Sequence, residues 1–375
     1  MQAVDYAKEL IQFESTSRLS NVDVSNYVDE TLKRLGFETE RIEHNDAAGI
    51  RKMSVVGKKG PGRGGLAYFG HTDVVPADPW RFSDHGPFQP TVVDGKLYGR
   101  GACDMKGSVA CMLAAAEQIP SERLKKPVYI TCTADEEIGY GGAIAVKQRS
   151  GLYLEMVTDD SLAIIGEPTR LEVVYAHKGT YGFTATSHGR AAHSSTSHGI
   201  NANLKMIPFL AEMKEIHDEV QNDPRWQDAE FDPPAINWNI GINDHTKAVN
   251  ITAPQSVCTV YYRPMPDQDP DSLLERAGAA AQRHGLDFQV MVRHIAVYVD
   301  PQSPFVQELV QLAGKTEPHT VSFGTDGNVL TELKRKVVLG PGDIAQAHTY
   351  DEWISLDQLE KGTALYSRLV EQYCC

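Results

Sequence analysis

The sequence of 375 residues lacks an excess of basic side chains, and this narrows the classes of partner that the protein can bind. Its 50 acidic residues outnumber 36 basic ones, which gives a formal net charge of −14. Nucleic-acid backbones are bound by clusters of lysine and arginine, so the charge balance argues against a nucleic-acid partner. An anionic small molecule is still compatible with it, because a few local cations can dominate one pocket.

Cysteine pairs and long apolar runs are also missing. The six cysteines are scattered without a CxxC pair, which favours reduced thiols in a cytoplasmic protein. No secretory signal is visible in the first residues, and no apolar run reaches the length of a membrane span. We therefore expect a cytoplasmic protein without a membrane partner. We also expect Cys374 and Cys375 to form an exposed tail.

Apolar strands alternate with helices over the first part of the chain, and an acidic residue or a histidine follows each of several strands. The clearest cases are the apolar runs 65–68, 127–133 and 161–165, which precede His71, Glu136-Glu137 and Glu167 respectively. In open α/β sheets, ligands bind at the edge formed by the carboxyl ends of the strands. The sequence therefore predicts a polar site at that edge.

The pattern changes after Tyr175. Residues 177–298 show half-exposed alternation typical of strands, together with two helical segments, and this suits a smaller α+β domain. The chain then returns to helix, loop and strand, and it closes with a helix over residues 356–373. We therefore expect an α/β domain with a mixed sheet, made of residues 1–176 and 299–375, into which the α+β domain is inserted.

A set of imidazole and carboxylate side chains stands after apolar strands or in glycine-rich loops: His71, Asp104, Glu137, Glu167 and His348. Each one taken singly would be an ordinary surface or capping residue, but five in such positions point to a shared site. These ligand types suit Zn²⁺, and also Co²⁺ or Mn²⁺. Asp104 is central in the set and is the natural bridge of a two-metal hydrolytic site.

Two further acidic residues have expected roles beside these ligands. The carboxylate of Asp73 can accept a hydrogen bond from the second ring nitrogen of His71 and so fix its tautomer. Adjacent side chains diverge, so Glu136 is expected to be a general base while Glu137 holds an ion. It would take a proton from the attacking water and pass it to the leaving amine. Taken alone, residues 135–137 could equally form a solvated acidic turn.

Several ordered motifs resemble the M20 family of metallopeptidases and amidohydrolases. The motifs are the stretches 70–76, 99–107, 135–137, 165–169 and 340–348. The resemblance covers nearly the whole chain and is closest to the branch of acetylornithine deacetylase and succinyl-diaminopimelate desuccinylase. It implies hydrolysis of the amide bond of an N-acyl amino acid. Glutamate at position 167 is typical of deacylase and carboxypeptidase-like members, which disfavours an aminopeptidase.

The resemblance also implies roles for the ligands by position. Asp104 would bridge two metal ions, with zinc as the expected metal. His71 and Glu167 would complete the site of one ion, and Glu137 and His348 that of the other. A cis peptide bond would follow Asp104, as it does in members of the family.

For the inserted domain, the resemblance implies a lid and dimerisation domain that selects the substrate. His193 would polarise the scissile carbonyl, in its own subunit or in the partner subunit, and Arg263 would bind the substrate carboxylate. Asn250 and Gly324 match further substrate-binding positions. The implied partners are a small N-acyl amino acid or short peptide and a second copy of the chain.

Alternatives stay open within and beyond this class. A metallo-carboxypeptidase, a dipeptidase or a succinyl-diaminopimelate desuccinylase would use the same site. A non-catalytic binding protein on a hydrolase scaffold would be expected to lack a ligand or the base. All five ligands and Glu136 are present, which favours an enzyme.

Overall fold

The computed structural model describes residues 1–375, and the chain folds into two units. Unit 1 comprises Met1–Tyr175, Val299–His319 and Thr325–Cys375, and unit 2 comprises Ala176–Tyr298 and Thr320–Gly324. The sequence had placed this last short segment in the first domain. It joins unit 2 because the Thr320 and Ser322 hydroxyls donate hydrogen bonds to main-chain carbonyls of residues 230 and 232.

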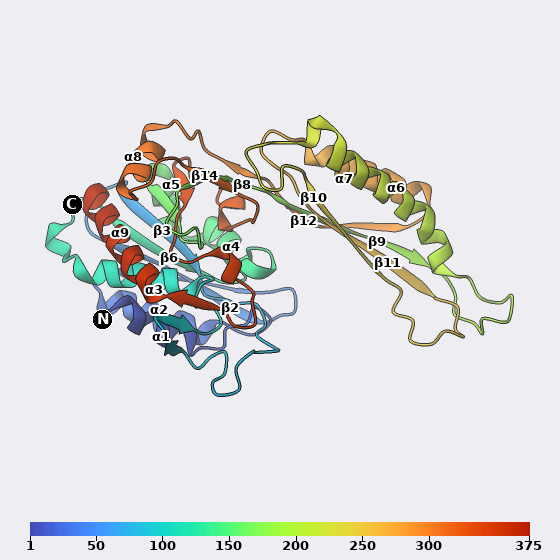
Figure 1. Cartoon of the computed structure of the whole chain (residues 1–375), viewed down its shortest axis with the longest axis horizontal. Coiled ribbons are helices and arrows are strands. Elements are labelled where there is room, and N and C mark those ends of the chain that lie inside the picture. The colour runs from blue at the N-terminus through green and yellow to red at the C-terminus, as the bar shows by residue number, and fades with distance from the viewer. The chain divides into compact units, whose positions relative to one another are not determined.

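Unit 1 is built around a large mixed β-sheet with helices on both faces (Figure 1). Its helices are α1 (Ala3–Ile11), α2 (Val22–Arg34), α3 (Lys106–Gln118), α4 (Gly141–Arg149), α5 (Gly151–Thr158), α8 (Pro304–Leu312) and α9 (Leu356–Cys374). Its strands are β1 (Glu38–Asn45), β2 (Arg51–Lys59), β3 (Leu66–His71), β6 (Val128–Thr133), β7 (Leu162–Ile165) and β15 (Lys336–Val338). Strand β8 (Val174–His177) leads out of unit 1, and β14 (His319–Val321) pairs with it.

Within unit 1, the strands of the sheet follow the order β1-β2-β6-β3-β7-β15-β8. Strand β3 runs parallel to both β6 and β7, so these three strands end at the same edge. A separate small sheet has the order β16-β5-β4, from β4 (Thr91–Val93), β5 (Lys96–Tyr98) and β16 (Trp353–Ser355). The parallel centre of the large sheet positions the polar residues that follow β3, β6 and β7.

Alternate side chains of β3 enter the cores on opposite faces of the sheet. The ring of Tyr68 lies 5.5 Å from that of Tyr366 on α9, while the ring of Phe69 lies 6.4 Å from that of Tyr153 on α5. Helix α3 is buried from Lys106 to Ala116, and its small residues allow α1 and α9 to pack closely against it. The strands in the middle of the sheet are therefore buried on both faces, as their continuous apolar runs indicated.

The C-terminal cysteines contradict the expectation of an exposed tail. Helix α9 continues to Cys374, which is 1% exposed, and the thiol of that residue donates to the carbonyl of Pro127 at 3.2 Å. The cause is the apolar stripe of α9, including Leu365 and Leu369, which packs into the core and carries the end of the helix with it. No helix of the structure combines the length and apolar character that crossing a membrane requires.

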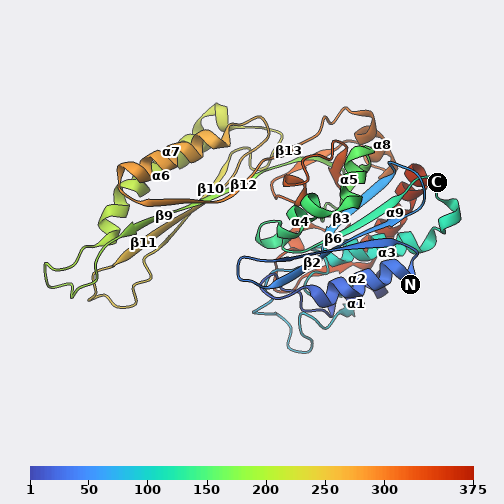
Figure 2. The same ribbon diagram turned by 180° about the vertical axis from the view of Figure 1, so that it is seen from behind.

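Unit 2 is a four-stranded antiparallel sheet with two long helices on one face (Figure 2). The elements are β9 (Thr180–His188), α6 (Ala202–Asn222), β10 (Asn237–Asn243), β11 (Gln255–Arg263), α7 (Pro270–Arg283), β12 (Asp287–His294) and β13 (Val297–Tyr298). The sheet order β10-β11-β9-β12 leaves β10 and β12 as its edges. Buried aromatic rings of Phe183, Trp238 and Tyr262 form the core of this unit.

Candidate metal centre

The predicted ligands of unit 1 gather at the edge where the parallel strands end. His71 is the last residue of β3, Glu136 and Glu137 lie in a short 3-10 helix after β6, and Glu167 follows β7. Asp104 lies in the loop before α3, and the peptide bond that follows it is cis. The chain direction of the strands, rather than closeness in sequence, brings these residues together.

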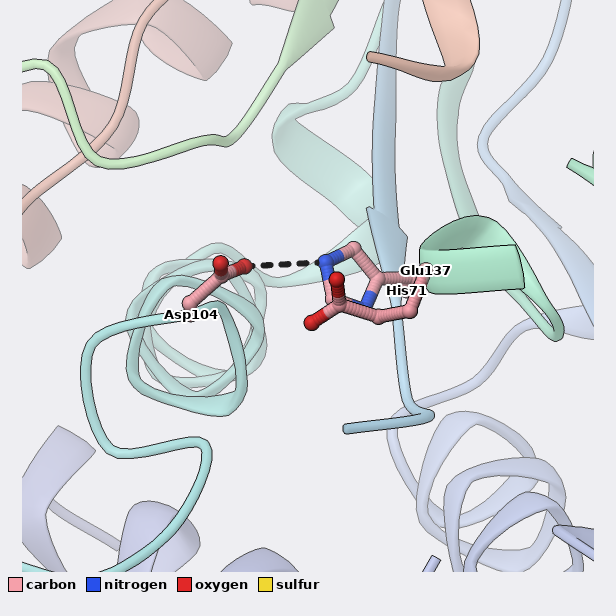
Figure 3. A group of neighbouring side chains, drawn as sticks. All are labelled: His71, Asp104 and Glu137. Atoms are coloured by element: carbon pink, nitrogen blue, oxygen red, sulfur yellow. Dashed lines mark hydrogen bonds and ion pairs between the residues drawn. The ribbon is translucent and has the colours of Figure 1, made fainter. Parts of the chain in front are cut away.

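The two carboxylate oxygens of Asp104 face two different imidazoles. Its Oδ1 lies 3.0 Å from Nε2 of His71, and its Oδ2 lies 3.4 Å from Nε2 of His348. Figure 3 shows Asp104 reaching His71 from the loop, with Glu137 beside them. Nε2 of His348 also lies 3.0 Å from Glu137. Asp104 thus stands between the two histidines.

Two glutamates complete the cluster on the side of His71. Nε2 of His71 lies 3.8 Å from Glu167 and 4.0 Å from Glu136. Ligand atoms of His71, Asp104 and Glu137 all lie within 4.8 Å of one another, and so do those of His71, Glu136 and Glu167. The structure therefore brings all five predicted ligands and the predicted base into one cluster.

The charge of this cluster fits a divalent cation. Burial raises the pKa of Glu136 and Glu167 well above the ordinary value, and burial also raises the pKa of Glu137. Buried carboxylates are costly to ionise unless positive charge lies nearby. A set of carboxylates and imidazoles is the ligand set that Zn²⁺ accepts. The thiol of Cys103 donates instead to the carbonyl of Asp343 at 3.2 Å.

Protonated histidines supply positive charge to the cluster when no metal is bound. Hydrogen bonds to Asp104 and Glu137 raise the pKa of His348 to about 10. Burial lowers the pKa of His71, but its hydrogen bond with Asp104 and the nearby glutamates raise it well above the ordinary value. Burial likewise opposes ionisation of Asp104, and hydrogen bonds from both histidines nevertheless lower its pKa. A metal ion would have to displace these ring protons.

The expected role of Asp73 is only partly correct. Nδ1 of His71 lies 2.9 Å from the main-chain carbonyl of Asp73, while the nearer carboxylate oxygen is 3.6 Å away. The carboxylate instead accepts hydrogen bonds from the Ser17 hydroxyl at 2.7 Å and from the backbone N–H groups of Glu136 and Glu137 at 3.1 and 3.3 Å. The turn after β3 brings the carbonyl closer to the ring. Asp73 therefore holds the segment that carries both glutamates.

Three buried carboxylates near the cluster were given no individual role from the sequence. Asp326 is 2% exposed and accepts a hydrogen bond from the Thr133 hydroxyl at 2.6 Å, and burial raises its pKa to about 6. Asp135 pairs with buried Lys52 at 2.7 Å. Glu352 pairs with buried Arg100 at 2.7 Å. A buried arginine such as Arg100 needs an acidic partner, so Arg100 is the residue that could have pointed to Glu352.

Two of the predicted substrate residues lie on neighbouring loops of unit 2. His193 and Ile251 form an isolated β-bridge, and the backbone N–H of Ser194 donates to the carbonyl of Asn250 at 2.9 Å. Nδ1 of His193 accepts a hydrogen bond from the backbone N–H of Ser195 at 3.2 Å. Both His193 and Asn250 are exposed.

Arg263 ends β11 and donates a hydrogen bond to the hydroxyl of Thr180. It lines a shallow surface pocket of about 560 Å³, whose other lining residues are Asn237, Asn239, Tyr261, Ser322 and Phe323. No acidic side chain lines this pocket. Gly324, the fourth predicted substrate residue, follows Phe323 and is the last residue of its segment in unit 2.

The chain matches a known family over most of its length. Residues 67–372 match the peptidase family M20/M25/M40. The acetylornithine deacetylase of Myxococcus xanthus is 35% identical over 379 aligned positions, which cover 98% of this chain and 96% of the relative. The acetylornithine deacetylase of Pasteurella multocida is 34% identical, with 92% of this chain and 89% of the relative covered.

Solved structures of this family share the fold. An M20 metallo-carboxypeptidase from Sulfolobus solfataricus superposes with a TM-score of 0.76 at 18% identity, covering 100% of this chain and 99% of the other. A dinuclear metal-binding M20 peptidase from Bacillus subtilis superposes with a TM-score of 0.67 at 14% identity, covering 99% and 97%. The chain belongs to the M20/M25/M40 peptidase family and is a metal-dependent hydrolase.

Proposed function

We propose that the protein is a two-metal deacylase that hydrolyses the amide bond of N-acyl amino acids, with N-acetylornithine as its substrate. The observation that carries this proposal is the position of Asp104, whose two oxygens face His71 and His348. The named relatives, which match over nearly the whole chain, direct the choice of substrate.

The proposed assignment of the metal ligands is the one that the family resemblance implies, and the distances around Asp104 support it. Asp104 would bridge the ions, with His71 and Glu167 on one ion and Glu137 and His348 on the other. Zn²⁺ is the proposed metal, and Co²⁺ or Mn²⁺ fits the same ligands. When bound, the ions would polarise the scissile carbonyl and lower the pKa of the attacking water.

Glu136 is the proposed general base. It is nearly buried, it lies beside the ligands, and its backbone is fixed by the carboxylate of Asp73. Burial raises its pKa, which brings its proton affinity closer to that needed for transfer near neutral pH. Glu136 takes a proton from the attacking water and then gives a proton to the leaving amine.

His193 is the proposed donor to the oxyanion that develops on the scissile carbonyl. Its Nδ1 accepts from a backbone N–H, so in the neutral ring the proton is on Nε2. That N–H is then available to donate to an oxygen. Asn250 is proposed to bind the substrate beside His193, because the backbone hydrogen bond from Ser194 to Asn250 holds their two loops together.

Arg263 is proposed to bind the free carboxylate of the substrate. Guanidinium and carboxylate groups pair through two parallel hydrogen bonds, and no acidic side chain in its pocket competes for the guanidinium. Gly324, which directly follows Phe323 of this pocket, would also contact the substrate. This arrangement favours N-acyl amino acids over acyl amines that lack a carboxylate.

A substrate panel tests the proposal. Purified protein loaded with Zn²⁺ or Co²⁺ is assayed with N-acetylornithine, other N-acetyl amino acids, N-succinyl-diaminopimelate and dipeptides. We expect kcat/KM to be highest for N-acetylornithine and hydrolysis to stop after chelation. Faster hydrolysis of dipeptides or of the succinyl substrate would replace the deacetylase proposal with one of the alternatives.

We further propose a homodimer formed through unit 2. Leu204 and Ile207 on α6 are 67% and 57% exposed, and Ile242 on the edge strand β10 is 61% exposed. Asn203 in the first turn of α6 donates to Asp244 just beyond β10 at 2.9 Å, so the start of the helix lies near the end of the edge strand. Light scattering should give twice the chain mass, and Leu204→Glu should give the monomer. We also propose a cytoplasmic location, which the scattered cysteines favour.

A further inference from the structure

Glu352 lies next to the loop that carries Asp104, although it is far from that loop in sequence. It immediately precedes β16, which pairs antiparallel with β5, and β5 leads directly into the Asp104 loop. The backbone N–H of Gly99 donates to the carbonyl of Glu352 at 3.1 Å. The strand pairing therefore places the Glu352 side chain against this loop, where it is completely buried.

The carboxylate of Glu352 accepts hydrogen bonds from four donors of the loop. Its Oε2 accepts from Nη1 of Arg100 at 2.7 Å and from the backbone N–H of Gly101 at 2.9 Å. Its Oε1 accepts from the backbone N–H groups of Cys103 and Asp104 at 2.8 and 3.0 Å. All four partners are donors, so both oxygens act as acceptors and the ionised form fits. Arg100 supplies the compensating charge.

The loop backbone has little freedom to adopt another shape. Gly101 has a φ of +84°, and a Cβ there would lie 2.8 Å from Cγ1 of Val74. Without the Glu352 carboxylate, the buried N–H groups of Cys103 and Asp104 would lose their acceptor, which is costly in a buried loop. The backbone orientation of Asp104, and thus the direction of its carboxylate, depends on Glu352.

We propose that Glu352 is a positioning residue of the metal centre: it fixes the Asp104 backbone so that the Asp104 carboxylate faces His71 and His348 at once. The inference rests on the ligand assignment of the proposed function. Glu352 also belongs to the segment that carries His348, so one buried carboxylate ties the bridging ligand to the segment of a second ligand. Its partners are loop donors, and it acts on the reaction only through Asp104.

The substitution Glu352→Gln tests this role. It replaces one carboxylate oxygen, which accepts from two donors, by an NH2 group that cannot accept from either. Glu371→Gln is the matched control: it breaks an exposed pair with Arg123, whose closest atoms are 3.0 Å apart. Metal-free proteins are titrated with Co²⁺ against a chromophoric chelator, and the visible spectrum of bound Co²⁺ reports ligand geometry. We expect Glu352→Gln to weaken Co²⁺ binding by about 10- to 100-fold and to change the spectrum, and Glu371→Gln to do neither.

A residue with only a structural role would lower the unfolding temperature and leave the folded protein's Co²⁺ affinity and spectrum unchanged, and that result would overturn the inference. If Glu352→Gln does not fold, Glu352→Asp keeps the charge but shortens the reach. The same loss of affinity is expected from it, and wild-type affinity would again overturn the inference. Wild-type protein that binds no Co²⁺ would instead overturn the proposed function itself.

Discussion

The candidate residues of the two units differ in how they are held. In unit 1, Asp104 and Glu167 are only 7% and 4% exposed, and buried carboxylates anchor the backbone of their neighbours. In unit 2, His193 and Asn250 are exposed and are held mainly by contacts between their own loops. The difference teaches that tertiary packing fixes most of the proposed metal ligands in advance, whereas the proposed substrate residues of unit 2 are held only locally.

This difference has an energetic reason. Donors and acceptors that are fixed before the reaction require no reorganisation when charge develops, so a site that is buried apart from the exposed His348 suits the charged centre. Water competes with the substrate for the polar groups of exposed residues, which lowers the affinity that these residues contribute. Such residues can nevertheless select among substrates without disturbing the core. Changes in unit 1 should therefore affect kcat and metal binding, and changes in unit 2 should affect substrate preference.

Replacing the proposed base is expected to have the largest effect. Glu136→Gln should lower kcat by about 100- to 10,000-fold, because proton transfer is lost while the ligands stay. Metal content, measured by elemental analysis, should match that of wild type. The neighbouring Glu137→Gln should instead lose metal. Near-normal turnover of Glu136→Gln on its best substrate would refute the assignment.

Removing the proposed oxyanion donor is expected to have the second largest effect. His193→Ala should lower kcat by about 100- to 1,000-fold without changing metal content, since one donor to the developing charge is lost. His198→Ala is the matched control, because that exposed histidine stands in the same loop. Equal loss in the two variants, measured by steady-state kinetics, would show that the loop and not the His193 ring matters.

Loss of the proposed carboxylate-binding cation should have a smaller effect, which depends on the substrate. Arg263→Ala should raise KM about 10- to 100-fold for substrates with a free carboxylate, because a charge-assisted pair is lost. Substrates with an amidated carboxylate should show little change. Arg276→Ala, an exposed arginine of α7 paired with Glu219, serves as the control. An equal loss on both substrate types would contradict the assignment.

Metal removal should affect unit 1 and leave unit 2 unchanged. Bound metal at about 100 times its Kd stabilises a folded protein by about 2.7 kcal/mol, so chelation should lower the unfolding temperature. Hydrogen exchange should then rise at the ends of β3 and β6, where the ligands lie. Exchange in β9–β12 should be unchanged. A uniform rise over both units would mean that the metal acts on the whole chain.

The metal-free centre should also depend on pH, and this is the smallest expected effect. The pKa of His348 is raised from 6.5 to about 10 by Asp104 and Glu137, so its ionised form stabilises the folded state. This contribution is complete below pH 6.5 and is lost as the pH rises through about 10. Urea unfolding of chelated wild type and His348→Gln should converge as the pH rises. A constant difference would contradict this account.

The sequence could group most of the candidate ligands because several of them stand at positions set by local structure. A polar residue after an apolar strand marks one edge of a parallel sheet, so His71, Glu137 and Glu167 could be grouped before the fold was seen. Asp104 could be added to this group because it stands in a glycine-rich loop. The positions of His71, Glu137 and Glu167 depend on strand direction, which the alternation of strands and helices reveals.

The residues that hold this centre were less predictable. Glu352 acts through the pairing of β16 with β5, and no local pattern shows which strands of a small sheet are neighbours. The carboxylate of Asp73 was expected to orient His71, but the geometry of one turn places its main-chain carbonyl at the ring instead. The burial of Cys374 follows from the packing of α9 rather than from its place at the end of the chain. Such features require tertiary contacts.

The number of metal ions that activate the enzyme tests the central claim most directly. Metal-free protein is titrated with Zn²⁺ while hydrolysis of N-acetylornithine is measured and bound metal is counted. The two-metal site predicts that bound metal saturates at two ions per chain and that activity reaches its maximum at that point. Saturation at one ion per chain with full activity, or hydrolysis that persists without metal, would contradict the account.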